Sequence, residues 1–135
     1  MTNSNNTSAH SSDDRAEARR LAVLAAQVAD GKGARDPIIL EVGDVLVLAD
    51  HFVVASAVND RQVKAIVDDI ERRVAEAGLG KPLRVEGLDT RQWVLLDYGD
   101  VVVHVFLQEV RDYYDLERLW SDVPRVDWSP TPVRS

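Results

Sequence analysis

The chain of 135 residues is long enough for one domain with a hydrophobic core, and its apolar share of 45% is that of an ordinary globular protein. It contains no cysteine, which excludes a disulfide scaffold, a thiolate zinc site and a cysteine nucleophile. Residues 36–128 hold 19 acidic residues against 10 lysines and arginines, which disfavours a surface for phosphate backbones and favours a basic protein as partner.

Two classes of partner are not expected from the sequence. Because the acidic segment has no basic stripe, direct sequence-specific nucleic-acid binding is disfavoured. No apolar run is long enough to span a bilayer, and the first residues lack the charged-then-apolar order of a signal peptide. We therefore expect a cytoplasmic protein with no membrane partner.

The N-terminal part of the chain predicts a tail followed by a helix. Residues 1–11 are poor in apolar side chains, so we expect a disordered tail. Ser12 is a suitable N-cap for a helix over 13–30, and Gly31 is a suitable end for it. Apolar residues of this helix, among them Leu21 and Val28, fall on one face.

Two strands and a second helix are predicted next. A strand over 38–42 ends at Gly43, and a second β-branched run covers 52–58. The segment 45–49 between them fits either a further strand or a helical turn, and both remain open. Asn59 and Gln62 then form a capping-box pattern, and apolar residues at helical spacing continue as far as Gly78.

The C-terminal half predicts three strands and a last helix. A short strand over 83–86 precedes a hairpin, whose strands cover 93–97 and 101–107. A helix over 109–120 follows, and Pro124 is expected to end the ordered structure. The predicted domain therefore covers 12–123, with 124–135 as a C-terminal tail. Helices interleaved with strands predict an α/β fold with a single mixed sheet flanked by helices.

The hairpin turn carries the best candidates for a metal or acid–base site, which are Asp97, Asp100 and His104. Two carboxylates across a turn could hold a divalent cation. Asp-Tyr-Gly-Asp is also ordinary turn chemistry, and we favour that interpretation. His104 lies in a very apolar strand, so we expect it to be buried, neutral and satisfied by one hydrogen bond.

An enzymatic alternative rests on Ser56, which follows a strand and precedes a capped helix. Phosphate-binding loops occur at such places, but this one lacks the glycines that let a backbone wrap a phosphate. The alternative function is a metal-dependent nucleotidyl or phosphoryl transferase that uses Asp97, Asp100 and Ser56. It is the weaker hypothesis, and we expect no cofactor.

Large aromatic residues gather near the C-terminal end, and their role is open. Tyr113, Tyr114 and Trp120 lie on the predicted last helix, where they could pack on the sheet or meet a protein partner or a second copy. Trp93 opens a strand beside a turn, so a core edge and a binding hot spot are comparable interpretations.

Five collinear segments between residues 16 and 120 resemble the ribosomal silencing factor family, also called the Iojap-like family. These segments are 49–56, 60–66, 82–87, 93–104 and 114–120. The resemblance implies a small α/β domain with nucleotidyltransferase-like topology but without the catalytic site, commonly a homodimer when free. Members bind a protein on the subunit-facing side of the large ribosomal subunit, block joining of the small subunit, and lower translation when nutrients are short.

For this chain, the resemblance implies a non-enzymatic translational repressor with Trp93 as the apolar anchor. Acidic side chains would pair with lysines and arginines of a basic ribosomal protein. The expected partner-binding residues are Trp93, Asp97, Tyr98, Asp100, Glu109 and Glu117.

Overall fold

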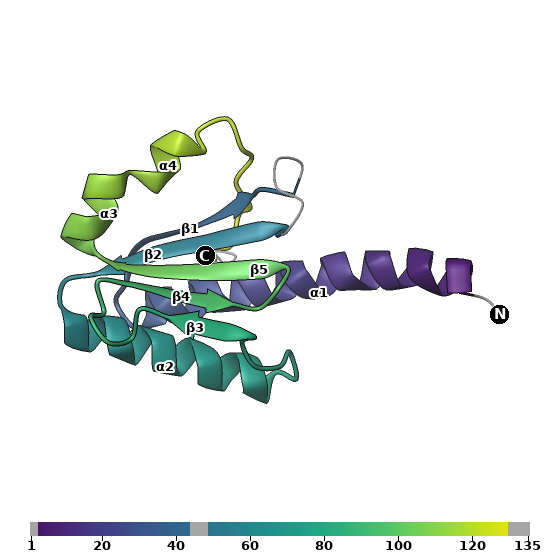
Figure 1. Ribbon diagram of the computed structural model, residues 1–135, viewed down its shortest axis with the longest axis horizontal. Helices are drawn as coiled ribbons and strands as arrows, with labels where there is room; N and C mark the ends of the chain where they lie inside the picture. Colours follow the sequence, from purple (N-terminus) through teal and green to yellow (C-terminus); the bar gives the residue numbers. More distant parts are fainter. Residues whose placement is uncertain (1–2, 44–48, 130–135) are drawn as a thin grey trace, which may run out of the picture.

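A single five-stranded sheet organises the computed structural model, which describes residues 3–43 and 49–129. The strand order is β1-β2-β5-β4-β3, in which β2 and β5 are parallel and the other pairs antiparallel (Figure 1). This confirms the predicted mixed sheet. The strands are β1 (Arg35–Glu41), β2 (His51–Ala57), β3 (Arg84–Glu86), β4 (Trp93–Asp97) and β5 (Val101–Leu107).

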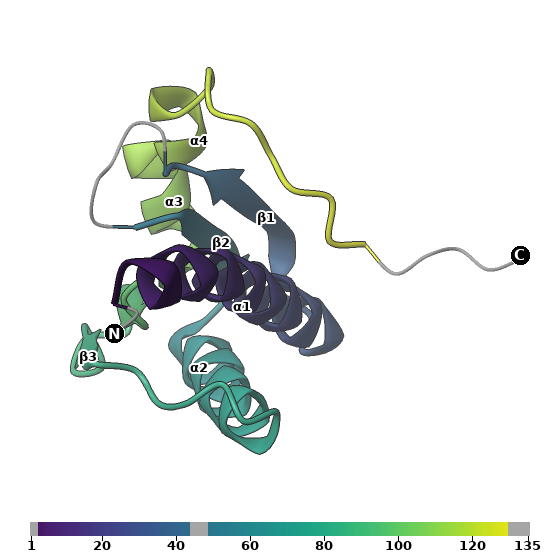
Figure 2. The ribbon, with the colours of Figure 1, turned by 90° about the vertical axis from the view of Figure 1, so that its right-hand side faces the viewer.

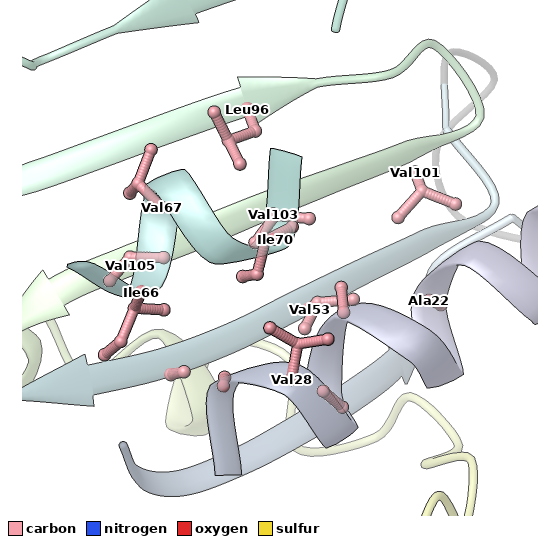
Figure 3. Packing of buried hydrophobic residues seen from close by; sticks show 14 of the residues in the cluster. Ala22, Val28, Val53, Ile66, Val67, Ile70, Leu96, Val101, Val103 and Val105 are labelled. Carbon is pink, nitrogen blue, oxygen red and sulfur yellow. The ribbon is translucent and has the colours of Figure 1, made fainter. Parts of the chain in front are cut away.

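Two long helices, α1 (Asn3–Gly31) and α2 (Asp60–Glu76), cover one face of the sheet (Figure 2). The part of α1 over the sheet buries mainly small side chains such as Ala22, so its backbone can lie close to the strands. Longer aliphatic side chains of α2, among them Ile66 and Ile70, fill the space above β5 (Figure 3). None of these three side chains is exposed to solvent.

The start of α2 follows its sequence signal closely. The side chain of Asn59 accepts a hydrogen bond from the backbone N–H of Gln62 at 2.8 Å, and Gln62 in turn accepts one from the N–H of Val58 at 2.9 Å. These bonds satisfy two backbone donors that would otherwise lack partners at the helix start. The predicted cap is therefore confirmed.

The predicted helix over 109–120 is wrong, because the chain forms two short helices instead. These are α3 (Gln108–Tyr114) and α4 (Leu116–Leu119), and Asp115 between them has a left-handed backbone with φ of 50°. Aspartate tolerates this conformation better than most residues. The break lets Glu117 fold back onto the buried guanidinium of Arg111, to which it is hydrogen bonded. Sequence periodicity carries no sign of that contact.

The N-terminal end of the chain also differs from expectation. Helix α1 begins at Asn3, so Ser12 lies within the helix and does not cap it, and the expected disordered tail is helical from Asn3 onward. A helix already formed over the sheet can be extended at little cost, since each added residue gains one hydrogen bond. The open question about 45–49 stays open, because residues 45–48 of that segment lie outside the described part of the chain.

Pro124 does not end the ordered structure. Its carbonyl oxygen accepts a hydrogen bond from the N–H of Glu41 at 2.8 Å. Two residues further on, the N–H of Val126 donates to the carbonyl oxygen of Ile39 at 3.0 Å. The indole N–H of Trp128 donates to the carbonyl of Pro37 at 2.7 Å. The segment thus covers the open edge of β1, a long-range contact invisible in the local sequence. None of the described helices combines the length and the apolar character that a membrane span requires.

Candidate functional site

The second face of the sheet is only partly covered by helices. Side chains alternate between the two faces along a strand, so Trp93 and Leu95 on β4 lie on the side away from α1 and α2. On that side, α3 and α4 lie beside β1, β2 and β5, and no described helix covers β3 and β4 (Figure 1). Trp93 and Leu95 are each partly exposed there. This region is the candidate protein-binding surface.

Trp93 is held on this surface by neighbours on three sides. Its ring stacks on Phe106 at 4.8 Å between centroids and lies 5.1 Å from the ring of Tyr114. Its indole N–H donates a 3.0 Å hydrogen bond to Nδ1 of His104. Gly87 approaches the Trp93 backbone so closely that a Cβ there would collide with the Trp93 carbonyl oxygen. The side chain is therefore both an edge of the core and a partly exposed aromatic surface.

His104 is buried, neutral and hydrogen bonded once, as predicted, but the expectation that one bond would satisfy the ring is wrong, because Nε2 is left unpaired among the described residues. Only 5% of the residue is exposed, and burial lowers its pKa to about 4. Since Nδ1 accepts the bond from Trp93, the proton is on Nε2, which has no hydrogen-bond partner among the described residues. The ring also makes an edge contact with Phe52 at 4.8 Å.

The aromatic residues of α3 and of the turn after α4 separate into two groups. Tyr113 is 81% exposed and Tyr114 53% exposed, and their rings meet edge to face at 5.0 Å. Trp120 instead packs on Phe52 at 5.8 Å, in a small cluster over β1 and β2. Core packing therefore explains Trp120. The two tyrosines extend the partly exposed region around Trp93, and we call Trp93, Tyr113 and Tyr114 together the aromatic surface.

The turn between β4 and β5 has the geometry that its sequence predicts. Gly99 has φ of +92°, and its N–H donates to the Asp97 carboxylate at 2.8 Å. The other carboxylate oxygen of Asp97 accepts from Arg84 at 2.9 Å. Burial raises the pKa of Asp97, but the bonds from Gly99 and Arg84 outweigh it and hold that pKa below its ordinary value. Asp97 thus supports the turn.

The other expected partner-binding residues differ in how they are placed. Tyr98 packs against the core on the α1 and α2 side, and burial, followed by the charge of Glu71, raises its pKa to about 12. Glu117 is tied to Arg111 at 2.6 Å. Asp100 and Glu109 are exposed, and Glu109 precedes Tyr113 by one turn of α3.

Arg111 is a structural residue that the sequence reasoning missed. Its guanidinium is buried and donates to the backbone carbonyls of Arg35 and Asp36 at 2.9 and 2.8 Å. It also binds Glu117 and the hydroxyl of Ser56. It therefore holds α3 and α4 against β1 and β2. An arginine inside an exposed-looking helix gives no local signal of this role.

The residues of the transferase hypothesis do not form one site. Ser56 is fully buried on β2, where its hydroxyl donates to Gln108 at 2.6 Å. In the parallel register, Ser56 pairs with Phe106, while the turn with Asp97 and Asp100 adjoins the other end of β5. At about 3.3 Å per residue, the two places are roughly 16 Å apart. In the described part of the chain, no group of three or more histidines or acids is arranged to hold a metal ion.

Comparison with protein families gives one match over most of the chain. A family model described as "Ribosomal silencing factor during starvation" matches residues 15–135. A Bacillus subtilis protein named "Ribosomal silencing factor RsfS" is 41% identical over 104 residues, which are 77% of this chain and 87% of that protein.

Two further proteins are similar to this chain, one with a solved structure and one from mouse. A crystal structure of a Chromobacterium violaceum protein is 34% identical, with a TM-score of 0.72, over 87% of this chain and 92% of that one. A mouse protein named "Mitochondrial assembly of ribosomal large subunit protein 1" is 29% identical over 92 residues, which are 40% of its length. The solved neighbour has the same fold as this chain.

Proposed function

The chain belongs to the ribosomal silencing factor family, and on this premise we propose that it represses translation by blocking the joining of ribosomal subunits. In this proposal it binds a basic protein on the subunit-facing side of the large subunit. It acts when nutrients are limiting, which the word starvation in the description of the matching family supports. The name of the mouse relative, which refers to the large ribosomal subunit, supports the choice of that subunit.

The observation that carries the proposal is the partly exposed aromatic surface on the second face of the sheet. Aromatic side chains are enriched in the buried centres of protein interfaces, and truncating such anchors removes much of the binding energy. Trp93 lies at the middle of this surface, with the exposed Tyr113 and Tyr114 beside it. A cluster of this kind is a suitable contact for another protein.

Charge and shape support the rest of the mechanism. The acidic balance of residues 36–128 favours association with a basic protein. Glu109 is exposed on α3 one turn before Tyr113, and Asp100 is exposed at the other end of β5, in the hairpin turn. The layer of α1 and α2 lies on the side of the sheet opposite α3 and α4 (Figure 2). In the proposed complex this layer would therefore project away from the partner. This layer occupies space that the small subunit would need.

Three further properties belong to the same proposal. The protein acts in the cytoplasm and without catalysis, since steric exclusion requires only occupancy of a surface. It is a homodimer when free, and the exposed Tyr113 and Tyr114 are the candidate contacts for the second copy. Docking on the ribosome would then compete with dimerisation for the same aromatic residues.

The proposal is tested by mixing purified large and small ribosomal subunits with the protein and separating joined from free subunits by sedimentation. The wild-type protein should lower the joined fraction and sediment with large subunits. Trp93→Ala should weaken large-subunit binding at least roughly 30-fold, since a central anchor contributes about 2 kcal/mol or more.

Trp128→Ala is the matched control, because it truncates the same kind of side chain against Pro37, away from the aromatic surface. It should bind large subunits as the wild-type protein does. Subunits that join equally well at saturating protein contradict the mechanism. Normal binding by Trp93→Ala, or an equal loss in both variants, contradicts the role of the aromatic surface.

A further inference from the structure

The orientation of the Trp93 ring is fixed by more contacts than packing requires. Phe106 stacks on it at 28° between ring planes, Tyr114 lies against it at 50°, and the N–H is bonded to His104. Ring contacts, of which His104 makes a third at 5.9 Å, do not by themselves favour either direction for the indole N–H. The hydrogen bond to a buried acceptor does, because the N–H is the only polar group of the ring.

Packing alone does not account for a histidine at position 104. The ring is 5% exposed and neutral, and its Nε2 has no partner among the described residues. An unpaired buried N–H is unfavourable, whereas an apolar side chain of similar size would fill the space without it. The neighbours across the strands, Leu95 and Val54, are apolar and offer no acceptor. The acceptor at Nδ1 is therefore what distinguishes the histidine from an apolar side chain.

From these contacts we propose that His104 is a positioning residue for Trp93, which turns the indole N–H inward and presents only an apolar ring to the protein partner. The inference rests on the proposed function, because it assumes that Trp93 is the anchor. It also limits the chemistry of the partner: the group that meets Trp93 is an aliphatic side chain or a cation over the ring, and not a hydrogen-bond acceptor for the indole.

Three substitutions separate this role from simple packing. His104→Leu removes the acceptor and keeps the site apolar, whereas His104→Gln keeps an acceptor oxygen. Trp93→Phe keeps an aromatic ring but lacks the N–H. Phe52→Leu is the matched control, because it removes a ring that touches His104 and leaves the hydrogen bond to Trp93 in place.

The first measurement is the indole N–H signal of Trp93 in the nuclear magnetic resonance spectrum of the free protein, assigned by its absence in Trp93→Phe. In the wild-type protein and in Phe52→Leu, this proton should exchange slowly with solvent. In His104→Leu it should exchange faster and its signal should shift, and His104→Gln should restore slow exchange. A signal that is the same in His104→Leu and the wild-type protein overturns the proposal.

The second measurement is the affinity for isolated large subunits. His104→Leu should weaken binding roughly five-fold, the size expected for one hydrogen bond that orders an anchor. In the Trp93→Phe background the same substitution should cause no further loss, because the donor is gone. An equal loss in both backgrounds overturns the positioning role.

The two proposals fail in different ways. If Trp93→Ala binds large subunits normally, the proposed function of this surface is wrong and the positioning role is lost with it. If Trp93→Ala loses binding while His104→Leu keeps full affinity, only the positioning role is overturned. If His104→Leu loses affinity and gains fast indole exchange, and His104→Gln restores both, the positioning role is supported.

Discussion

The two faces of the sheet differ in chemistry although the same strands build both. The face under α1 and α2 is filled by aliphatic side chains that are almost completely buried. The opposite face carries the larger and more polar side chains, and part of it is exposed. Along β5 the contrast is residue by residue: Val103 and Val105 point to the first face, and His104 and Phe106 to the second.

Together with the proposed function, this difference predicts separate roles for the two faces. An aliphatic layer offers no directional groups, so it contributes stability through burial alone. The second face combines rings, a hydrogen-bonded histidine and exposed tyrosines, which fix one arrangement of a surface that another protein can contact. Substitutions on the first face should therefore change stability, and substitutions on the second should change binding at a smaller cost in stability.

The largest effect is expected on the first face. Ile70→Ala on α2 removes a fully buried side chain above the sheet, and the free energy of unfolding should fall by roughly 3 kcal/mol or more (Figure 3). Urea denaturation followed by circular dichroism measures this change. The fraction that remains folded should still bind large subunits normally, and a loss of affinity beyond the unfolded fraction would contradict the separation of tasks.

A smaller effect on stability is expected on the second face as the pH falls. Burial holds the pKa of His104 at about 4, below its ordinary value of 6.5. As the pH falls through 6.5, the unfolded chain binds a proton that the folded protein does not, so stability is lost from that pH down to about 4. Between pH 7 and pH 5 this one group lowers the free energy of unfolding by about 2 kcal/mol.

The measurement compares the change in unfolding free energy between pH 7 and pH 5 in the wild-type protein, His104→Gln and Phe52→Leu. His51, whose pKa burial also lowers, and the carboxylates are present in all three proteins, so their contribution is common. His104→Gln should lose less stability on acidification, and Phe52→Leu should keep the wild-type change. Equal changes in all three proteins would show that His104 does not titrate as a buried group.

The parts of the fold that could be predicted from the sequence are those set by local signals. The strands of the hairpin begin and end where predicted, and the cap of α2 is made by Asn59 and Gln62. Each depends on residues within a few positions, such as Gly99 in the turn. The burial of His104 followed in the same way from its apolar neighbours in the strand.

The parts that could not be predicted depend on contacts between distant residues. The split into α3 and α4 accompanies the ion pair of Arg111 with Glu117, and Arg111 also binds the carbonyl of Arg35 far away in the sequence. The pairing of the segment after Pro124 with β1 is equally remote. At the candidate site, the sequence singled out Trp93, but the direction of its N–H depends on a register between two strands.

The smallest effect is expected from two exposed acids, Glu109 beside the aromatic surface and Asp100 in the hairpin turn at the other end of β5. Asp100→Asn and Glu109→Gln should each weaken large-subunit binding by less than about 1 kcal/mol, because exposed charges are screened by water and salt. Their main effect should be on the rate of association, which depends on long-range attraction to a basic partner. The combined variant should therefore associate more slowly at low salt and respond less to added salt.

A charge-matched control on the other face sharpens this last test. Asp68→Asn with Glu76→Gln on α2 removes the same net charge from exposed positions that pair with Lys64 and Arg72. If attraction depends only on net charge, both double variants should slow association equally. If Glu109 beside the aromatic surface steers the partner, the α2 variant should keep most of the rate, since a charge beyond about 10 Å from the partner is largely screened at 0.1 M salt. By the same argument Glu109→Gln should account for most of the slowing, because Asp100 lies at the other end of β5 from Trp93 and Phe106. Equal association rates for the two double variants would contradict a specific electrostatic role of the second face and leave only its aromatic contacts.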